Sequence, residues 1–287
     1  DNLKVIFTED ITKNNYHPLC MLSLAVNYHF SQLNPRNYYL TNIMIHTGNV
    51  VLVFFLLLAL CRRLKVDEAG QLFIAGFGAL WHGVHPMHVE SVSWIAERKD
   101  VMYAFFYFAG MLCYLRYLKG DTKKWTWYGI TYLLFVLSCL SKPMAVVFPF
   151  SILCLDLLMQ RKFDIVLVTD KVIFFVTSLV CGSMAFYTQN KTGAVASFST
   201  LTLGERFMYA AYGYIMYVSK LFNPTYLSTF YPYPIRYVSG GLPGIFYMAP
   251  LLAIGSVVVP IWYTWKYKRE YFRIVTFGVC YFVANVM

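Results

Sequence analysis

Long apolar segments separated by short basic clusters dominate this sequence. A helix needs about 20 mostly apolar residues to cross the hydrocarbon core of a membrane, and several segments approach that length, the shorter ones with tilt or with polar ends. Only 13% of the residues are charged, whereas soluble domains carry about 25%. The sequence therefore predicts an all-α integral membrane protein built as a multispanning helical bundle. The apolar segments cover roughly residues 39–60, 71–84, 101–118, 125–140, 144–159, 172–187, 245–265 and 271–287.

Basic residues gather at the ends of these segments, at 62–65, 119–124, 161–171 and 266–269. Lys and Arg are enriched in cytoplasmic loops, so all of these clusters are predicted to face the cytoplasm. A net charge of +10 is explained by this distribution, and nucleic acid is not an expected partner. Two apolar segments separate each of the first three clusters from the next, as an even number of crossings requires.

Three candidate segments, 172–187, 207–221 and 245–265, lie between Lys171 and Lys266, so one of them is not expected to span. Segment 207–221 is amphipathic and rich in tyrosine, which favours the membrane surface. The mixed segment 16–34 is interpreted in the same way. The prediction is an external loop with an interfacial helix at 1–38, a transmembrane bundle at 39–187 with external loops at 85–100 and 141–143, a long external loop with an interfacial helix at 188–244, and further transmembrane helices at 245–287.

The densest polar string runs from His85 to Asp100. An ionised group at the bilayer centre costs about 2.5–3.5 kcal/mol, so this string is expected outside the hydrocarbon. Two histidines and Glu90 can hold protons or a metal, and Arg98 can neutralise a phosphate. The alternative for residues 97–100 is a solvated loop with Asp100 as helix N-cap. Zinc is not favoured, because H-x-x-H-x-E lacks the helical H-E-x-x-H spacing.

Polar residues elsewhere form weaker signals. Asn42, His46 and Asn49 share one helix face, where they either bind a ligand or hydrogen-bond to a neighbouring helix. Lys142, at an external turn, either binds phosphate or extends to the interface. Tyr231, in an aromatic and proline-rich run, suits a sugar or lipid-headgroup wall, with an interfacial aromatic belt as the alternative. Residues 190–192 form an N-glycosylation sequon.

Several motifs together resemble one family, the transmembrane O-mannosyltransferases with tetratricopeptide repeats and their bacterial relatives, of the GT-C glycosyltransferase superfamily. The resemblance follows the same order along nearly the whole chain. It rests on YHPLCMLS at 16–23, NY at 27–28, LNP at 33–35, YLTN at 39–42 with His46, HPMHVESV at 85–92, RKD at 98–100, SKPM at 141–144, KLF at 220–222 and FYPYP at 230–234.

The resemblance implies a GT-C-type membrane enzyme that takes a hexose, mannose or a similar sugar, from a polyprenyl-phosphate donor. The acceptor is a protein hydroxyl, a lipid or a glycan on the external face. In such enzymes an acidic residue of the first external loop acts as base or metal-linked anchor. That residue is expected upstream of Asp1 in a longer protein, and Glu9 and Asp10 are not assigned its role. No 34-residue repeat is visible, and tetratricopeptide repeats would follow Met287.

The expected site combines the resemblance with the polar residues. The leaving phosphate needs charge stabilisation, for which Arg98 is the first candidate. His85, His88 and Glu90 are the candidate catalytic residues. A divalent metal, Mg²⁺ or Mn²⁺, is a candidate cofactor without assigned ligands. The candidate substrate-binding residues are Arg98, Asp100, Lys142, Arg206, Lys220, Tyr231, His17, Asn42 and His46.

Two other functions compete with glycosyl transfer. A transporter or channel predicts ionisable residues near mid-membrane and inverted repeats, whereas apart from His46 the titratable groups lie at the segment ends. A non-catalytic membrane scaffold would not need the string from His85 to Asp100. The expected partners are the bilayer, the lipid-linked donor and a protein or glycan acceptor. The bacterial inner membrane is the favoured location, with the endoplasmic reticulum as the location of a eukaryotic protein.

Overall fold

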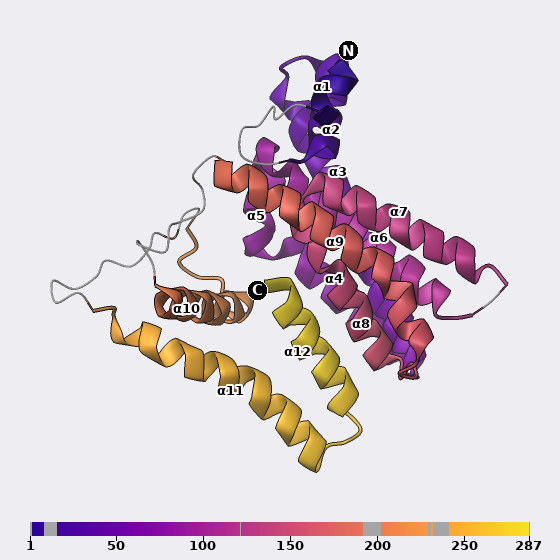
Figure 1. The fold of residues 1–287 in the computed structure, drawn as a ribbon, viewed down its shortest axis with the longest axis vertical. Helices are drawn as coiled ribbons and strands as arrows, with labels where there is room; N and C mark the ends of the chain where they lie inside the picture. The colour runs from indigo at the N-terminus through magenta and orange to yellow at the C-terminus, as the bar shows by residue number, and fades with distance from the viewer. Residues whose placement is uncertain are drawn as a thin grey trace. The chain divides into compact units, whose positions relative to one another are not determined.

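The computed structural model describes residues 2–8, 16–120, 122–191, 202–228, 231 and 241–286. All regular elements in these ranges are helices, which confirms the all-α prediction (Figure 1). They are α1 (Asn2–Thr8), α2 (Pro18–Ser31), α3 (Pro35–Arg63), α4 (Glu68–Val84), η1 (Pro86–His88), α5 (Val89–Ser93), η2 (Ile95–Glu97), α6 (Arg98–Tyr117), α7 (Lys124–Ser141), η3 (Pro143–Val147), α8 (Phe148–Leu158), α9 (Ile165–Lys191), α10 (Leu203–Phe222), α11 (Gly244–Tyr267) and α12 (Phe272–Val286).

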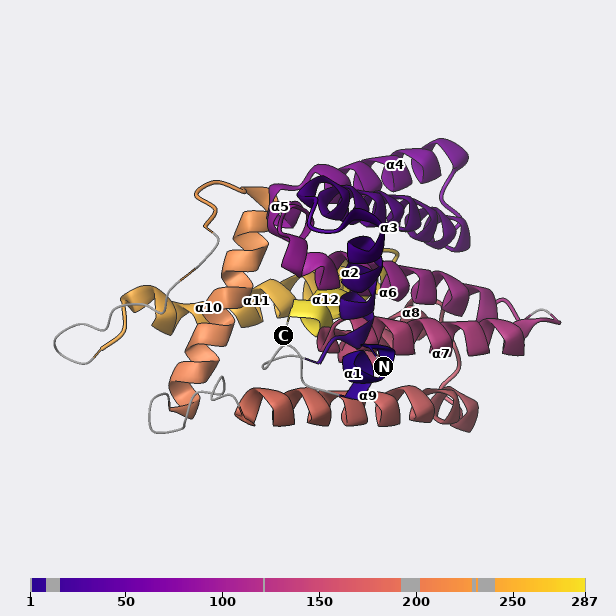
Figure 2. The same ribbon diagram turned by 90° about the horizontal axis from the view of Figure 1, so that it is seen from above.

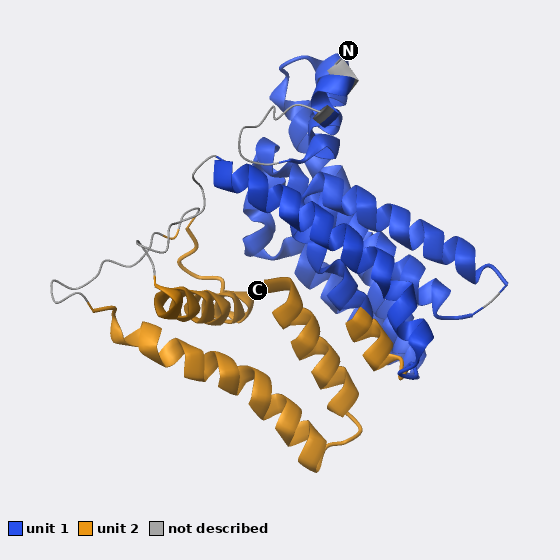
Figure 3. Ribbon diagram, in the orientation of Figure 1, with its two compact units in different colours: residues 1–152, 161–194 blue, residues 153–160, 195–287 orange. Residues whose placement is uncertain are grey.

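The chain divides into two compact units (Figure 3). Unit 1 comprises Asp1–Ile152 and Arg161–Ala194, and unit 2 comprises Leu153–Gln160 and Val195–Met287. The boundaries predicted at residues 38, 187 and 244 concern the side of the membrane that each segment faces, so they stay predictions.

Within the residues that the structure describes, three helices are long and apolar enough to cross a membrane: α3, α9 and α11. The integral membrane prediction is thereby confirmed. Helix α9 begins at Ile165, although residue 172 was the predicted start of the apolar segment. The helix includes Asp170 and Lys171 because their charges are compensated within unit 1: Asp170 accepts from Lys171 at 2.5 Å and from Arg161 at 2.6 Å.

In unit 1, α3 packs against α4 and α6, and α6 also packs against α7 (Figure 2). Fully buried aromatic rings fill the centre, where Phe135 stacks on Phe148 at 5.2 Å. Polar side chains then fix the start of α6: Asn49 donates to the Val101 carbonyl at 2.9 Å, and Ser138 donates to the Tyr103 carbonyl at 2.9 Å. This end of α6 carries most of the predicted site.

Unit 2 contains the predicted amphipathic segment as helix α10. The helix begins four residues earlier than predicted because Thr202 and Glu205 form a capping box, in which each side chain bonds the other's backbone N–H. Its buried Tyr214 packs beside Ala249 and Ala253 of α11. The helix is therefore confirmed, and its location at the membrane surface stays a prediction.

Candidate active site

The segment from His85 to Asp100 is folded as short helical turns between α4 and α6. His85 caps η1 by accepting from the Met87 backbone N–H at 3.3 Å. Helix α6 begins at Arg98, so the prediction of Asp100 as N-cap is wrong, and Glu97 holds that position. Asp100 lies in the first turn instead, where the helix dipole stabilises a negative charge, and it accepts from the Ser91 hydroxyl at 3.2 Å.

The Arg98 side chain is fully buried and joins three helices. Its Nε donates to Asn42 Oδ1 at 2.8 Å, and the other guanidinium nitrogens donate to acceptors on α2 and on the first turn of α3. These acceptors are the Ser23 carbonyl and hydroxyl at 3.1 Å each, Asn27 Oδ1, and the Tyr38 carbonyl at 3.1 Å. All of them are neutral. The first phosphate candidate is thus a buried cation that holds the fold together, and its role toward a phosphate stays a prediction.

Lys142 and Asp100 form a partly exposed ion pair that connects the two segments predicted as external, 85–100 and 141–143. Their nitrogen and oxygen lie 2.5 Å apart, and the two side chains are 20% and 22% exposed. The Lys142 ammonium also lies 5.7 Å from the centre of the Tyr103 ring. Unlike the Arg98 side chain, which is fully buried, the Lys142 side chain is partly exposed.

A second ion pair joins Glu97 and Lys99 at 2.9 Å, on the turn that leads into α6. The pKa of the ring of His17, which precedes α2, is lowered mainly by burial. The positive charge of nearby Lys99 lowers this pKa further. The His17 Nδ1 is buried without a hydrogen-bond partner. The predicted substrate-binding residue His17 therefore lies in the same region as Lys99.

Four histidine rings cluster beside this region, from α3, α4 and η1. The ring of His88 lies 4.6 Å from that of His82, 5.9 Å from that of His46 and 6.2 Å from that of His85. The structure thus brings together the predicted residues His46, His85 and His88. Within the described residues, no three His, Cys, Asp or Glu side chains are arranged to hold a metal ion. The Mg²⁺ or Mn²⁺ cofactor stays a prediction without assigned ligands.

His82 was missed by the sequence analysis because it lies inside an apolar segment. The available signal was the spacing H-x-x-H-x-x-H formed by His82, His85 and His88. The His82 Nε2 is buried and lacks a hydrogen-bond partner, whereas His46 contacts the Gly83 carbonyl through Nε2 at 3.1 Å.

Protonation of His88 is disfavoured in the folded protein. Burial, reinforced by the charges that His46 and His85 can carry, lowers its pKa to about 4, against about 6.5 in an unfolded chain. As the pH falls below 6.5 the unfolded state takes up the proton first, so stability present above that pH is lost toward pH 4. Between pH 7 and pH 5 we expect the wild type to lose about 1–2 kcal/mol more than His88→Gln. Unfolding of both proteins in detergent at the two pH values measures this, and equal losses would contradict it.

The three polar residues on one face of α3 make the contacts expected of packing groups. Asn42 donates to the carbonyls of Val92 and Trp94 at 3.3 and 3.4 Å, in addition to accepting from Arg98.

Glu90, in contrast, is exposed on α5. Of the three candidate catalytic residues, Glu90 is therefore the most accessible to an acceptor.

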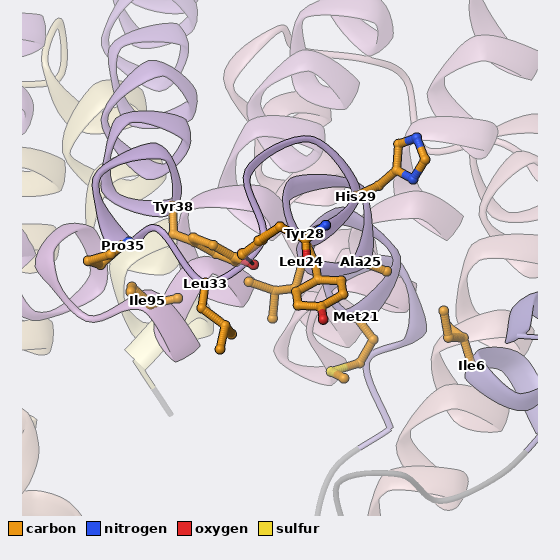
Figure 4. Close-up of a pocket in the computed structure, with 11 residues that line it drawn as sticks. Ile6, Met21, Leu24, Ala25, Tyr28, His29, Leu33, Pro35, Tyr38 and Ile95 are labelled. Carbon is orange, nitrogen blue, oxygen red and sulfur yellow. Dashed lines mark hydrogen bonds between the residues drawn. The ribbon is translucent and has the colours of Figure 1, made fainter.

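An apolar pocket of about 840 Å³ is lined by residues that include Tyr38 and Ile95 (Figure 4). The Tyr38 carbonyl accepts from Arg98, and the centre of the Tyr38 ring lies 5.7 Å from the guanidinium carbon. Most of the remaining lining comes from α2, and Ile6 is contributed by α1. The other lining residues are Met21, Leu24, Ala25, Tyr28, His29, Gln32, Leu33 and Pro35.

The remaining candidates belong to unit 2. Lys220 donates to the carbonyls of Thr225 and, at 3.4 Å, of Tyr226, closing the turn after α10. The Tyr231 hydroxyl accepts from the Ser228 N–H at 3.1 Å, and Arg206 lies in the first turns of α10. Their roles stay predictions. Several predicted features, Glu9, Asp10, Thr192, and the rest of the FYPYP run, lie outside the described residues.

Known proteins are similar to part of this chain. Protein O-mannosyl-transferase tmtc2 of Xenopus laevis is 34% identical over 125 residues, 42% of this chain. The resemblance to protein O-mannosyl-transferases is confirmed. Human protein O-mannosyl-transferase TMTC3 is 30% identical over 140 residues, 48% of the chain. Protein O-mannosyl-transferase Tmtc1 of Drosophila melanogaster is 31% identical over 133 residues, 46% of the chain. Each match covers only 14% of these relatives. No family model and no solved structure matches the chain.

Proposed function

We propose that the chain is part of a membrane glycosyltransferase that moves a hexose such as mannose from a polyprenyl-phosphate donor to a protein hydroxyl, or to a lipid or glycan, on the external face. The observation that carries this proposal is the similarity to proteins named O-mannosyl-transferases. These relatives are animal proteins, which favours the endoplasmic reticulum over the bacterial inner membrane.

The charges of the site support a phosphate-linked donor. Asp100 pairs with Lys142, and Glu97 pairs with Lys99, whereas the partners of Arg98 are neutral. With Glu90 counted, the charged side chains of segments 85–100 and 141–143 sum to zero, so the support comes from Arg98, the buried cation that no carboxylate of the described residues neutralises. Its charge is felt strongly because burial lowers the effective dielectric constant. The apolar pocket that Tyr38 lines suits the hydrocarbon chain of the donor, because its lining is mostly apolar side chains.

In the proposed reaction the acceptor oxygen attacks the anomeric carbon, and the bond from that carbon to the phosphate oxygen breaks. The polyprenyl phosphate leaves with the bonding electrons, and the Lys142 ammonium stabilises its developing charge. The acceptor proton passes to a carboxylate, for which Glu90 is the candidate within this chain. Neutral His88 and the capping residue His85 orient the acceptor. No step is assigned to a metal ion, since the described residues offer no ligand group for one.

The direct test uses the full-length protein in detergent with a radiolabelled polyprenyl-phosphate hexose. Release of sugar from the lipid is expected, and Glu90→Gln should lower its rate by about a hundredfold, the usual contribution of a general base. Because Glu90 is exposed, the substitution should leave the melting temperature unchanged. Unchanged turnover would remove Glu90 from the mechanism. Absence of release with several donors would overturn the proposed function and favour a transporter or scaffold.

A further inference from the structure

A second site is formed at the opposite end of α3 and α6 from Arg98. Asn42, which contacts Arg98, and Arg62 are twenty residues apart on α3, which corresponds to about 30 Å along a helix. This length matches the thickness of the hydrocarbon core. If Asn42 lies at one membrane surface, Arg62 lies at the other, at the depth of the lipid headgroups.

A groove of about 650 Å³ opens at this end, between α3, α6 and the first turn of α7. Its walls divide into an apolar part and a basic rim. The apolar part is Phe55, Leu58, Ala59, Leu112, Leu115 and Trp127, and the rim is Arg62, Arg63, Arg116 and Lys119.

The rim carries positive charge that no carboxylate compensates within the described part of the chain. Two of its members are held in place: Arg63 donates to the Leu115 carbonyl at 3.1 Å, and the Arg116 guanidinium carbon lies 5.7 Å from the centre of the Trp127 ring. Arg62, Arg116 and Lys119 are exposed. The groove thus presents cations at its mouth and hydrocarbon along its floor.

A molecule that satisfies both parts carries a phosphate next to a hydrocarbon chain and lies in the plane of the membrane. We propose that this groove binds an anionic phospholipid, with its phosphate between Arg62 and Arg116 and one acyl chain on the apolar floor. Basic pockets between membrane helices bind anionic lipid headgroups in this way, and arginine contributes paired donors to phosphate oxygens. The proposal is independent of glycosyl transfer.

The test measures lipid binding to the full-length protein, purified in nonionic detergent and stripped of lipid. Dioleoylphosphatidylglycerol should bind, and dioleoylphosphatidylcholine should bind much more weakly. Arg62→Gln/Arg116→Gln should weaken phosphatidylglycerol binding by about thirtyfold, since each basic group near an anionic lipid contributes about 1 kcal/mol. Native mass spectrometry measures each affinity. Both arginines are exposed, so the folded state should persist.

A matched control separates this site from general attraction between a basic protein and an anionic lipid. Lys123→Gln/Lys124→Gln removes the same charge at the end of the bundle where α7 begins, but neither lysine lines the groove, so binding should stay within about twofold of wild type. Equal losses in the two double variants would overturn the proposal, as would equal binding of the two lipids.

Two further measurements test the apolar half. Leu112→Trp fills the floor without changing any charge, and it should weaken phosphatidylglycerol binding as the arginine variants do. Inorganic phosphate and glycerol phosphate, which lack acyl chains, should not displace the lipid at comparable concentrations. Displacement by either, or full binding to Leu112→Trp, would show a free phosphate site and overturn the assignment to a lipid.

Discussion

Replacing Arg98 by methionine is expected to lower the free energy of unfolding by about 3–5 kcal/mol, because several neutral acceptors lose their shared donor at once. Methionine fills similar space but donates no hydrogen bond. The buried acceptors Asn42 Oδ1 and the Tyr38 carbonyl then lose their donor, as do the partly buried acceptors on Ser23 and Asn27. Each buried group left unsatisfied costs about 1–3 kcal/mol. Arg98→Lys should be only a partial rescue, because an ammonium lacks the planar fork that reaches α2 and α3 together.

The adjacent residue provides the control for Arg98. Lys99 has the same charge and belongs to the same turn of α6, but its side chain is 20% exposed and paired locally with Glu97. Lys99→Met should therefore change the free energy of unfolding by no more than about 0.5 kcal/mol. Unfolding of the three variants in mixed detergent measures the difference. If Arg98→Met were as stable as Lys99→Met, the buried network would not be what holds α2 against α3 and α6.

Hydropathy located the helices because a span leaves a continuous apolar signal in the sequence. Segments 39–60 and 245–265 lie inside α3 and α11, and charged residues mark where these helices end. The same rule failed at the start of α9. Lys171 was counted with the basic cluster at 161–171, so the segment was predicted to start after it. The Lys171 charge is instead paired with Asp170, which also pairs with Arg161, and a local pattern does not contain that pairing.

The polar end of unit 1 was predictable as a region, but the partners of its residues were not. The string from His85 to Asp100 identified the region by composition. Arg98 was assigned to phosphate because the sequence shows its charge, whereas its neutral acceptors lie 56 to 75 residues away along the chain. His82 was hidden in the same way, since an apolar helix contributes it to a cluster formed only by folding.

Loss of the Lys142 charge is expected to have the largest effect on catalysis. Lys142→Gln should lower the rate of sugar transfer by about a hundred- to a thousandfold, the effect of removing one preorganised group that stabilises developing charge. The loss should appear in kcat more than in KM, because the charge on the phosphate grows only as the glycosidic bond breaks. Lys142→Arg should recover part of the rate. Lys99→Gln, which removes an equally exposed charge, should stay within about threefold of wild type.

The alternative, that Lys142 only fixes the turn between α7 and η3 through Asp100, makes a different prediction. Lys142→Gln and Asp100→Asn both break the 2.5 Å ion pair, so a purely structural role requires equal losses of rate and of stability. If Lys142 acts on the phosphate, Asp100→Asn keeps the ammonium and removes the carboxylate that competes for it, and its loss of rate should be about tenfold or less. Single-turnover assays of the two variants with the same lipid-linked donor separate these outcomes, since only direct stabilisation of the leaving group makes the lysine variant much slower than the aspartate variant.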